Sequence, residues 1–274
     1  ATETEWLLQM LAARTSENSP ADGYVRYLPL SSYHGSGSRK WEELDVRNFL
    51  TKQIATFNQQ VGTNSLDFAE LYAEWLDCRK LSEGQLHLLP KRIQHWPCQP
   101  RIMPVVFCNE GEELALRATL ESLAVQSYAA SRILVLGPAG FAPSTEYAGQ
   151  FQVRQGDGFK QINTLLANEG QADWILLLQA GDRLHPHALV IMAERMALRA
   201  QILCMYSDEG THDGRESSMP IFKPDFSLDL MRSLPYVGRQ LAFKCEELSA
   251  LGGFDENHAG LAPHDMLWRM VEDH

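Results

Sequence analysis

Apolar residues in the second half of the chain alternate between short strand-type runs and longer stretches with helical spacing. Four strand-type runs lie at residues 103–107, 132–136, 174–178 and 202–206. Stretches with an apolar residue every three or four positions connect them, among them 158–168 and 186–199. Because strand–helix repeats of this length need right-handed crossovers, the pattern predicts an α/β fold, with a mainly parallel, Rossmann-like sheet flanked by helices.

The first of these helices has a start signal in the sequence. Asn109 follows the strand at 103–107 and is a residue type that caps helices, and Glu112 stands three positions later, as in a capping box. We therefore expect the helix to begin next to Asn109. Its apolar positions, which we expect to face the sheet, are Leu114, Leu116, Leu120 and Leu123.

The first third of the chain has a different pattern. Helical spacing of apolar residues is clearest in two stretches, 41–57 and 65–76. These stripes either form the core of a helical subdomain or contact a protein or membrane surface. A boundary follows at residues 96–100, which contain two prolines and no periodicity. The sequence thus predicts a helical N-terminal region with linkers, residues 1–96, and an α/β domain, residues 97–274.

Composition and charge exclude several classes of protein. The chain has 274 residues, 45% of them hydrophobic, with 24 Lys and Arg against 35 Asp and Glu, a net charge of −11. An acidic chain with scattered basic residues is not suited to nucleic acid. The apolar runs are far shorter than the ~20 residues of a membrane-spanning helix, and the five cysteines have neither disulfide-framework nor zinc-site spacing. We expect a cytoplasmic protein without a membrane span, while peripheral membrane association stays open.

Ligands of parallel sheets bind beyond the carboxyl ends of the strands. Residues 108–111 follow the first strand and combine a helix start with backbone amides that can hold a nucleotide or phosphate. No GxGxxG follows that strand and the chain has no GxxxxGK[ST], which argues against a hydride-transferring dinucleotide enzyme and a P-loop enzyme.

Carboxylates mark three later segments. Asp182 follows the strand at 174–178 and either caps the turn before the next helix or faces the crevice and binds a divalent cation. Asp208 and Glu209 open a loop of about twenty residues, a length typical of a binding loop or lid. Alternatively, its carboxylates other than Asp208 form a solvated rim. Asp265 stands where we expect a helix to open, so the helix dipole favours its ionised form.

The ordered motifs resemble a known family. They lie at residues 104–110, 120–128, 175–189, 206–209, 220–227, 236–238, 251–255 and 264–269, and include Tyr-Ser-Asp-Glu, Phe-Lys-Pro-Asp and Gly-Gly-Phe-Asp. In this order they resemble the family-2 glycosyltransferases, nucleotide-sugar-dependent enzymes with a GT-A fold, and in particular bacterial transferases that build O-antigen, rhamnan-type or flagellin glycans. The resemblance covers about residues 65–274.

The resemblance implies an inverting sugar transfer in polysaccharide biosynthesis, from a nucleotide sugar to a glycan, a lipid-linked or a protein acceptor. Asp265 matches the catalytic base, and Asp182 matches one ligand of a divalent cation, Mg²⁺ or Mn²⁺. The residues expected to bind the nucleotide sugar are Cys108, Asn109, Glu110, Gly137 and Asn163. Those assigned to the acceptor or to its loop are Asp208, Glu209, Lys223, His264 and Arg269.

Departures from the family pattern leave a competing hypothesis. The metal motif Asp-x-Asp followed by Asp reads Gln-Ala-Gly-Asp at 179–182, and Gly137 with Pro138 replaces an acidic residue that holds the nucleotide base. His264 replaces a common Glu and either packs or binds the acceptor. Metal use therefore stays open, and a catalytically silent GT-A module that binds nucleotide or glycan, or scaffolds a partner, is the alternative. The sequence stops short of elements that usually follow in the family, so we expect a trimmed form or a fragment of a longer transferase.

Overall fold

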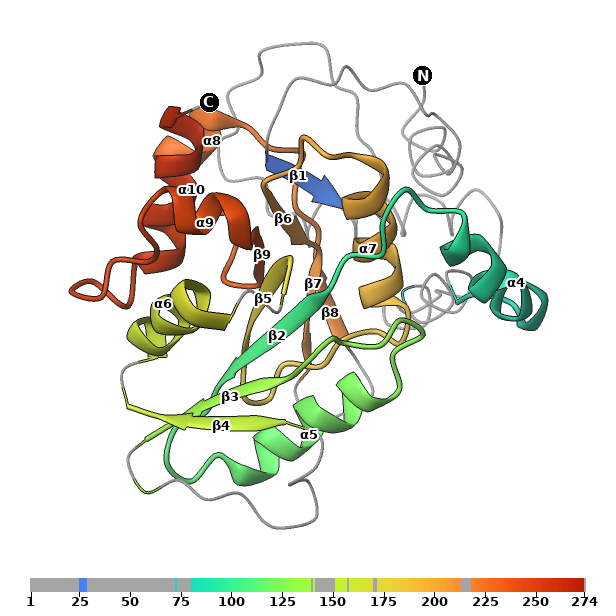
Figure 1. Ribbon diagram of the computed structural model, residues 1–274, viewed down its shortest axis with the longest axis horizontal. Helices are drawn as coiled ribbons and strands as arrows, with labels where there is room; N and C mark the ends of the chain where they lie inside the picture. The colour runs from blue at the N-terminus through green and yellow to red at the C-terminus, as the bar shows by residue number, and fades with distance from the viewer. Residues whose placement is uncertain are drawn as a thin grey trace, which may run out of the picture. The chain divides into compact units, whose positions relative to one another are not determined.

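The computed structural model describes residues 25–28, 72, 80–138, 140, 151–156, 158–169, 172–212 and 218–273 (Figure 1). Two compact units divide the chain, and the larger one comprises residues 22–28, 81–207 and 226–274. The stretches 41–57 and 65–76 lie outside the described residues, apart from Tyr72. The predicted helical subdomain and its boundary after residue 96 therefore stay predictions.

The larger unit is built on a seven-stranded sheet with the strand order β1-β6-β9-β5-β2-β3-β4. In that order the strands are Val25–Leu28, Cys204–Ser207, Leu241–Lys244, Trp174–Gln179, Ile102–Phe107, Leu134–Gly137 and Gln152–Gln155. All neighbouring strands pair in parallel except β9, which runs antiparallel to β5 and β6. The predicted mainly parallel sheet is confirmed.

Three strands of the sheet were not predicted. β1 and β4 form the two edges, and the sequence of β4, Gln-Val-Arg-Gln, lacks the apolar run of a buried strand. An edge strand has one hydrogen-bonded neighbour and needs less apolar surface, so its pattern is weak. β9 has a buried strand pattern over only four residues, too short to separate from a helix segment by periodicity.

Helices cover both faces of the sheet, as expected (Figure 1). Their bounds are α4 Glu83–Gln94, α5 Glu113–Ala124, α6 Gly158–Glu169, α7 Ala188–Leu198, α8 Leu228–Ser233, α9 Cys245–Ala250 and α10 Ala262–Asp273. α6, α9 and α10 pack against one face through residues such as Ile162, Leu248 and Met266. α4, α5 and α7 pack against the other face. Because successive strand residues point to opposite faces, Ile175 and Leu177 of β5 join the first core, and Leu176 and Leu178 join the second.

The starts of three helices differ from the prediction. α5 begins at Glu113, its N-cap is Glu112, and no side chain caps it, so the predicted Asn109 cap is wrong. Gly111 has a φ of +82°, which a continuing helix does not allow. α7 begins after Pro186 instead of including it, and α10 begins three residues before Asp265. Helix ends are the least certain part of a periodic pattern, because the apolar stripe does not mark them.

The smaller unit contains the antiparallel hairpin of β7 Glu209–His212 and β8 Ser218–Ile221 within its described part. Among the residues that the structure describes, none of the helices combines the length and the apolar character that crossing a bilayer requires.

The buried face and the exposed face of α5 allow a matched test of the core. Leu120 is 3% exposed, whereas Leu114, expected on the buried face, is 83% exposed. We expect Leu120→Ala to lower the free energy of unfolding by about 2–5 kcal/mol, because it leaves a cavity against the sheet. Leu114→Ala on the same helix should change it by less than about 0.5 kcal/mol. Urea denaturation of both variants makes the comparison, and equal effects would contradict the assigned helix face.

Candidate functional site

A pocket of about 250 Å³ opens at the carboxyl ends of β2 and β3. Its lining residues are Phe107, Cys108, Asn109, Glu110, Leu136, Gly137, Pro138, Gly156 and Gly158. Four of the five residues that the sequence analysis assigned to the nucleotide sugar thus line one pocket. They come together because β2 and β3 are parallel neighbours, so the segments that follow them lie at the same edge.

Two features shape the wall of this pocket: the turn at residues 109–112 and the close contact between Gly158 and Phe107. Glu112 Oε2 accepts hydrogen bonds from the backbone N–H of Asn109 at 2.8 Å and from Asn109 Nδ2 at 3.1 Å, and these bonds lower the pKa of Glu112. The Asn109 side chain is therefore engaged in its own turn. At Gly158 a Cβ would lie 2.5 Å from Phe107 Cε1, so only glycine lets α6 approach β2 this closely.

Cys108 is buried in this wall as a neutral thiol. Burial, followed by the negative charges of Glu112 and Glu113, raises the pKa of Cys108 to about 11. A thiol with this pKa is almost fully protonated near pH 7, so Cys108 is not an activated nucleophile.

Asp182 stands in a turn directly after β5. Its Oδ2 accepts the N–H of Gln179 at 2.8 Å, and its Oδ1 contacts Arg239 Nη2 at 2.5 Å. The side chain of Asp182 is 9% exposed, that of Arg239 60%. Both carboxylate oxygens thus have protein partners, one of them a cation. Arg239 was missed, because it lies 57 positions away and no sequence spacing pairs the two residues.

A metal site has limited support from these contacts. Among the described residues, no cluster of three or more His, Cys, Asp or Glu side chains is placed to hold a metal ion. Asp182 is the one carboxylate at the positions where the resemblance implies a metal motif, and it forms an ion pair with Arg239. The donor set does not fit a dedicated divalent-cation site, so we assign no chemical step to a metal.

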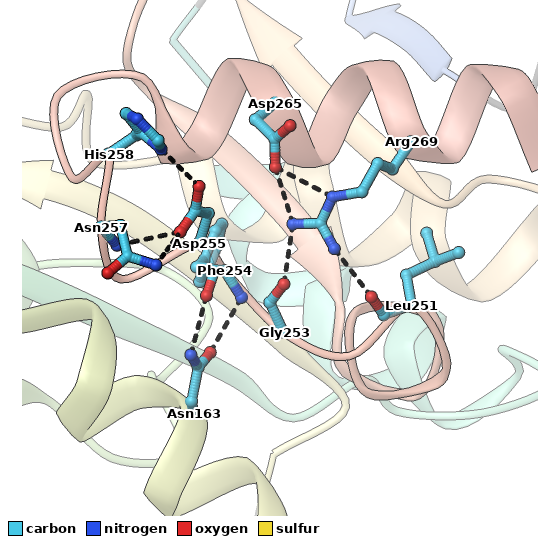
Figure 2. Close-up of polar contacts among 9 residues, drawn as sticks. All are labelled: Asn163, Leu251, Gly253, Phe254, Asp255, Asn257, His258, Asp265 and Arg269. Atoms are coloured by element: carbon cyan, nitrogen blue, oxygen red, sulfur yellow. Dashed lines mark hydrogen bonds and ion pairs between the residues drawn. The ribbon is translucent and has the colours of Figure 1, made fainter.

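Asp265 lies in the first turn of α10, as its fourth residue (Figure 2). The expectation that it opens the helix is wrong, because its N–H already donates to Leu261 O at 2.9 Å. The carboxylate is held by Arg269, one turn later: Oδ2 accepts from Nε at 2.9 Å and lies 2.8 Å from Nη2. Within the described part of the chain, Oδ1 has no hydrogen-bond partner, and the Asp265 side chain is 43% exposed.

Hydrogen bonds from α10 and from α6 hold the loop between α9 and α10 (Figure 2). From α10, Arg269 donates to Leu251 O at 2.7 Å and to Gly253 O at 2.8 Å. From α6, Asn163 accepts the N–H of Phe254 at 2.9 Å and donates to Phe254 O at 2.9 Å. The Asn163 amide, assigned to the nucleotide sugar, is thus engaged with the loop, and its contact with the donor stays a prediction.

One histidine lies in this loop, His258, and a second, His264, lies in the first turn of α10. His258 Nδ1 lies 2.7 Å from Asp255 Oδ2, and the pKa of His258 is raised, first by the hydrogen bond to Asp255 and also by the charge of Asp265. His264 is half-buried, burial lowers its pKa, and Nε2 is buried with no partner in the described part of the chain. A neutral His264 fits both alternatives from the sequence, packing or acceptor binding.

The remaining assigned residues form a cluster in the smaller unit. The backbone N–H of Lys223 donates to Asp208 Oδ1 at 2.8 Å, and its ammonium pairs with Glu209. Lys223 is almost fully buried, and the Glu209 side chain is 23% exposed. Glu209 therefore neutralises a buried cation, which a purely solvated acidic rim does not explain.

Substitutions at two adjacent glycines test the contact between this loop and Asn163. Gly252 and Gly253 have φ of +83° and +79°, but only at Gly253 would a Cβ meet another group, Asn163 Oδ1 at 2.4 Å. Both Gly→Ala changes should lower the free energy of unfolding by about 1–2 kcal/mol through left-handed strain. Gly253→Ala should cost about 1–3 kcal/mol more, because a well-packed site cannot take an added methyl group. Thermal or urea unfolding measures this, and Asn163→Ala should remove the difference; equal losses for both glycines would contradict the contact.

Comparisons with known proteins agree with the motifs. No protein-family model matches the chain. The chain is 32% identical over 214 residues to the O-antigen biosynthesis protein RfbC of Myxococcus xanthus, which covers 73% of this chain and 16% of RfbC. It is 25% identical over 223 residues to the uncharacterized protein y4gI of Sinorhizobium fredii, covering 77% of this chain and 24% of that protein. The chain thus spans less than a quarter of the length of either relative.

Two solved structures are similar at low identity. Staphylococcus aureus TarS 1–349 in complex with UDP has a TM-score of 0.47 and 16% identity, over 61% of this chain and 54% of that chain. The mannosyltransferase PcManGT from Pyrobaculum calidifontis, in complex with GDP-Man and Mn²⁺, has a TM-score of 0.39 and 14% identity, over 63% and 54%. The sequence similarity to RfbC, together with the mainly parallel sheet, supports a domain of the GT-A glycosyltransferase type, as the motifs predict.

Proposed function

We propose that this chain is the catalytic domain of a glycosyltransferase that moves a sugar, with inversion, from a nucleotide-activated donor to a glycan, lipid-linked or protein acceptor. The observation that carries the proposal is the state of Asp265. One carboxylate oxygen is fixed by Arg269, and the other is open to solvent without a partner in the described part of the chain. A carboxylate in this state can accept a proton from a hydroxyl group placed beside it.

The pocket at the ends of β2 and β3 is the proposed place of the nucleotide. Its volume, about 250 Å³, is below the ~300–1,000 Å³ of sites that enclose a drug-sized ligand. It therefore suits one part of the donor, such as the base, rather than the whole molecule. Its lining includes residues 107–110, Gly137 and Pro138, and in our proposal the base packs against them.

The proposed reaction balances with Asp265 as the base. Asp265 Oδ1 takes the proton of the acceptor hydroxyl as the acceptor oxygen forms a bond to the anomeric carbon of the sugar. The bond between that carbon and the donor diphosphate breaks on the opposite face, and the nucleoside diphosphate leaves with the electron pair. Attack on the face opposite the leaving group inverts the configuration.

The leaving group carries negative charge, which a nearby cation stabilises. Arg239 is the candidate for this role in our proposal, because its guanidinium is 60% exposed and is held beside Asp182 at the carboxyl end of β5. Part of its donor set remains for a phosphate, since an arginine has five N–H donors and one contact to Asp182 is observed.

Replacing the proposed base tests the central assignment. Asp265→Asn keeps the size of the side chain but removes the charge and the basic oxygen, so we expect the rate of sugar transfer or donor hydrolysis to fall by ~10²–10⁴-fold. Asp273→Asn, an exposed change on the same helix, is the matched control and should leave the rate unchanged. An undiminished rate in Asp265→Asn, with the fold intact by circular dichroism, would show that another group is the base.

Nucleotide-sugar binding can be measured without knowing the acceptor. A panel of UDP-, GDP- and dTDP-sugars is screened by thermal unfolding, since a ligand at ~100 times its dissociation constant adds ~2.7 kcal/mol of stability. We expect one donor to stabilise the chain equally in EDTA and in Mn²⁺, because Arg239 occupies the available oxygen of Asp182. Arg239→Gln should weaken that stabilisation.

The same screen has two contrary outcomes. Stabilisation that appears only with Mn²⁺ would restore a metal role for Asp182. No stabilisation by any nucleotide or nucleotide sugar would favour a catalytically silent module that scaffolds a partner.

A further inference from the structure

The guanidinium of Arg269 contacts both the proposed base and the loop before α10 (Figure 2). Nε and Nη2 both contact Oδ2 of Asp265, Nη1 donates to Leu251 O, and Nη2 also donates to Gly253 O. All of these contacts lie between 2.7 and 2.9 Å. One planar group therefore joins the helix that carries the base to the loop that precedes this helix.

The contacts restrict how the Asp265 carboxylate can turn. An isolated i,i+4 ion pair on a helix is a weak interaction and by itself would hold the carboxylate only loosely. Here the guanidinium is itself fixed by two backbone carbonyls, and the Arg269 side chain is 30% exposed. A rigid donor fork holds its acceptor in one orientation at a lower entropic cost than a flexible ammonium. Arg269 therefore holds Oδ2 of Asp265, and Oδ1 of the same carboxylate remains accessible to solvent.

The loop is in turn fixed from the other side. Asn163 pairs with both the N–H and the carbonyl of Phe254, and its Nδ2 donates to Glu256 Oε1 at 3.1 Å. Gly253 packs so closely on the Asn163 amide that no side chain fits between them. The carbonyls that anchor Arg269 are therefore part of a segment with little freedom to shift.

We propose that Arg269 is the positioning residue of Asp265: by tying Oδ2 to the carbonyls of Leu251 and Gly253, it presents Oδ1 to the acceptor hydroxyl. This inference rests on the proposed function, in which Asp265 is the base. Arg269 itself acts through Asp265 and needs no contact with donor or acceptor. A small misplacement of a reacting group can cost ~10²-fold in rate, so the role is measurable.

The test is a double-mutant cycle between the base and the arginine. The variants are Arg269→Lys, Asp265→Asn and the double variant, with Arg232→Lys on α8 as the matched control, since Arg232 is exposed and pairs with Asp229 three positions earlier. Each is assayed for release of the nucleoside diphosphate (UDP, GDP or dTDP) from the sugar nucleotide that stabilises the full chain most in the thermal screen. Turnover and the KM for that donor are determined separately, and thermal unfolding reports the folded fraction.

Arg269→Lys keeps the positive charge but removes the planar set of N–H donors. We therefore expect turnover to fall by ~10–100-fold, while the KM for the donor changes less than about twofold. In the Asp265→Asn background the same substitution should have no further effect, because the group it positions is already gone. Arg232→Lys should match the parent chain.

Other outcomes overturn the inference in distinguishable ways. A raised KM with unchanged turnover would make Arg269 a donor-binding residue, and unchanged turnover with a lower melting temperature would make it merely structural. Equal effects of Arg269→Lys with and without Asp265→Asn would show that the two residues act independently. If Asp265→Asn alone leaves the rate unchanged, the proposed function fails first, whatever Arg269 does.

A second variant keeps the test decisive if Arg269→Lys does not fold. Asn163→Ala loosens the loop from the α6 side and leaves the contact between Arg269 and Asp265 in place. It should lower turnover in the parent chain but not in the Asp265→Asn background. A loss in both backgrounds would contradict positioning through the base.

Discussion

The parallel pairing of β2 with β5 is the constraint on which the rest of the larger unit depends. Six consecutive residues of β2 pair with six of β5, from Ile102 with Trp174 to Phe107 with Gln179. Both strands are buried on both faces except at their last residue. A one-residue slip would send every buried side chain to the opposite face. The register therefore determines where both strands end and which polar segments meet beyond them.

The edge of the sheet at the carboxyl ends of β2, β3 and β5 brings together side chains that are far apart in the sequence. The pocket lined by Cys108, Asn109 and Gly137 follows β2 and β3, and the turn with Asp182 follows β5. Two of the carboxylates that the motifs point to have an arginine partner in the structure, Arg239 for Asp182 and Arg269 for Asp265. The arginines determine which carboxylate oxygens stay available, and hence what chemistry each group can perform. Asp265 retains an open oxygen, whereas Asp182 does not.

The local pattern of apolar residues predicted correctly those elements whose position depends mainly on burial. The apolar runs predicted the central strands, and the helical spacing over 158–168 predicted α6, whose Phe159, Ile162 and Leu165 lie in the core. The pattern failed where a terminus depends on a single turn. Asn109 bonds with Glu112 in a turn that Gly111 interrupts, so α5 starts later and Leu114 faces solvent. Periodicity carries no information on such ends.

The α/β fold and the order of its motifs could be predicted from the sequence, because apolar spacing and residue identity are local properties of the chain. The sequence also singled out Asp265, Asp182, Asn163 and Arg269 by resemblance. What these side chains contact depends on the fold as a whole: Asn163 forms hydrogen bonds with a loop residue 91 positions away, and Arg239 pairs with Asp182 across 57 positions. The reason is physical, since a hydrogen bond or ion pair depends on distance in space, and the packing of the whole sheet sets that distance.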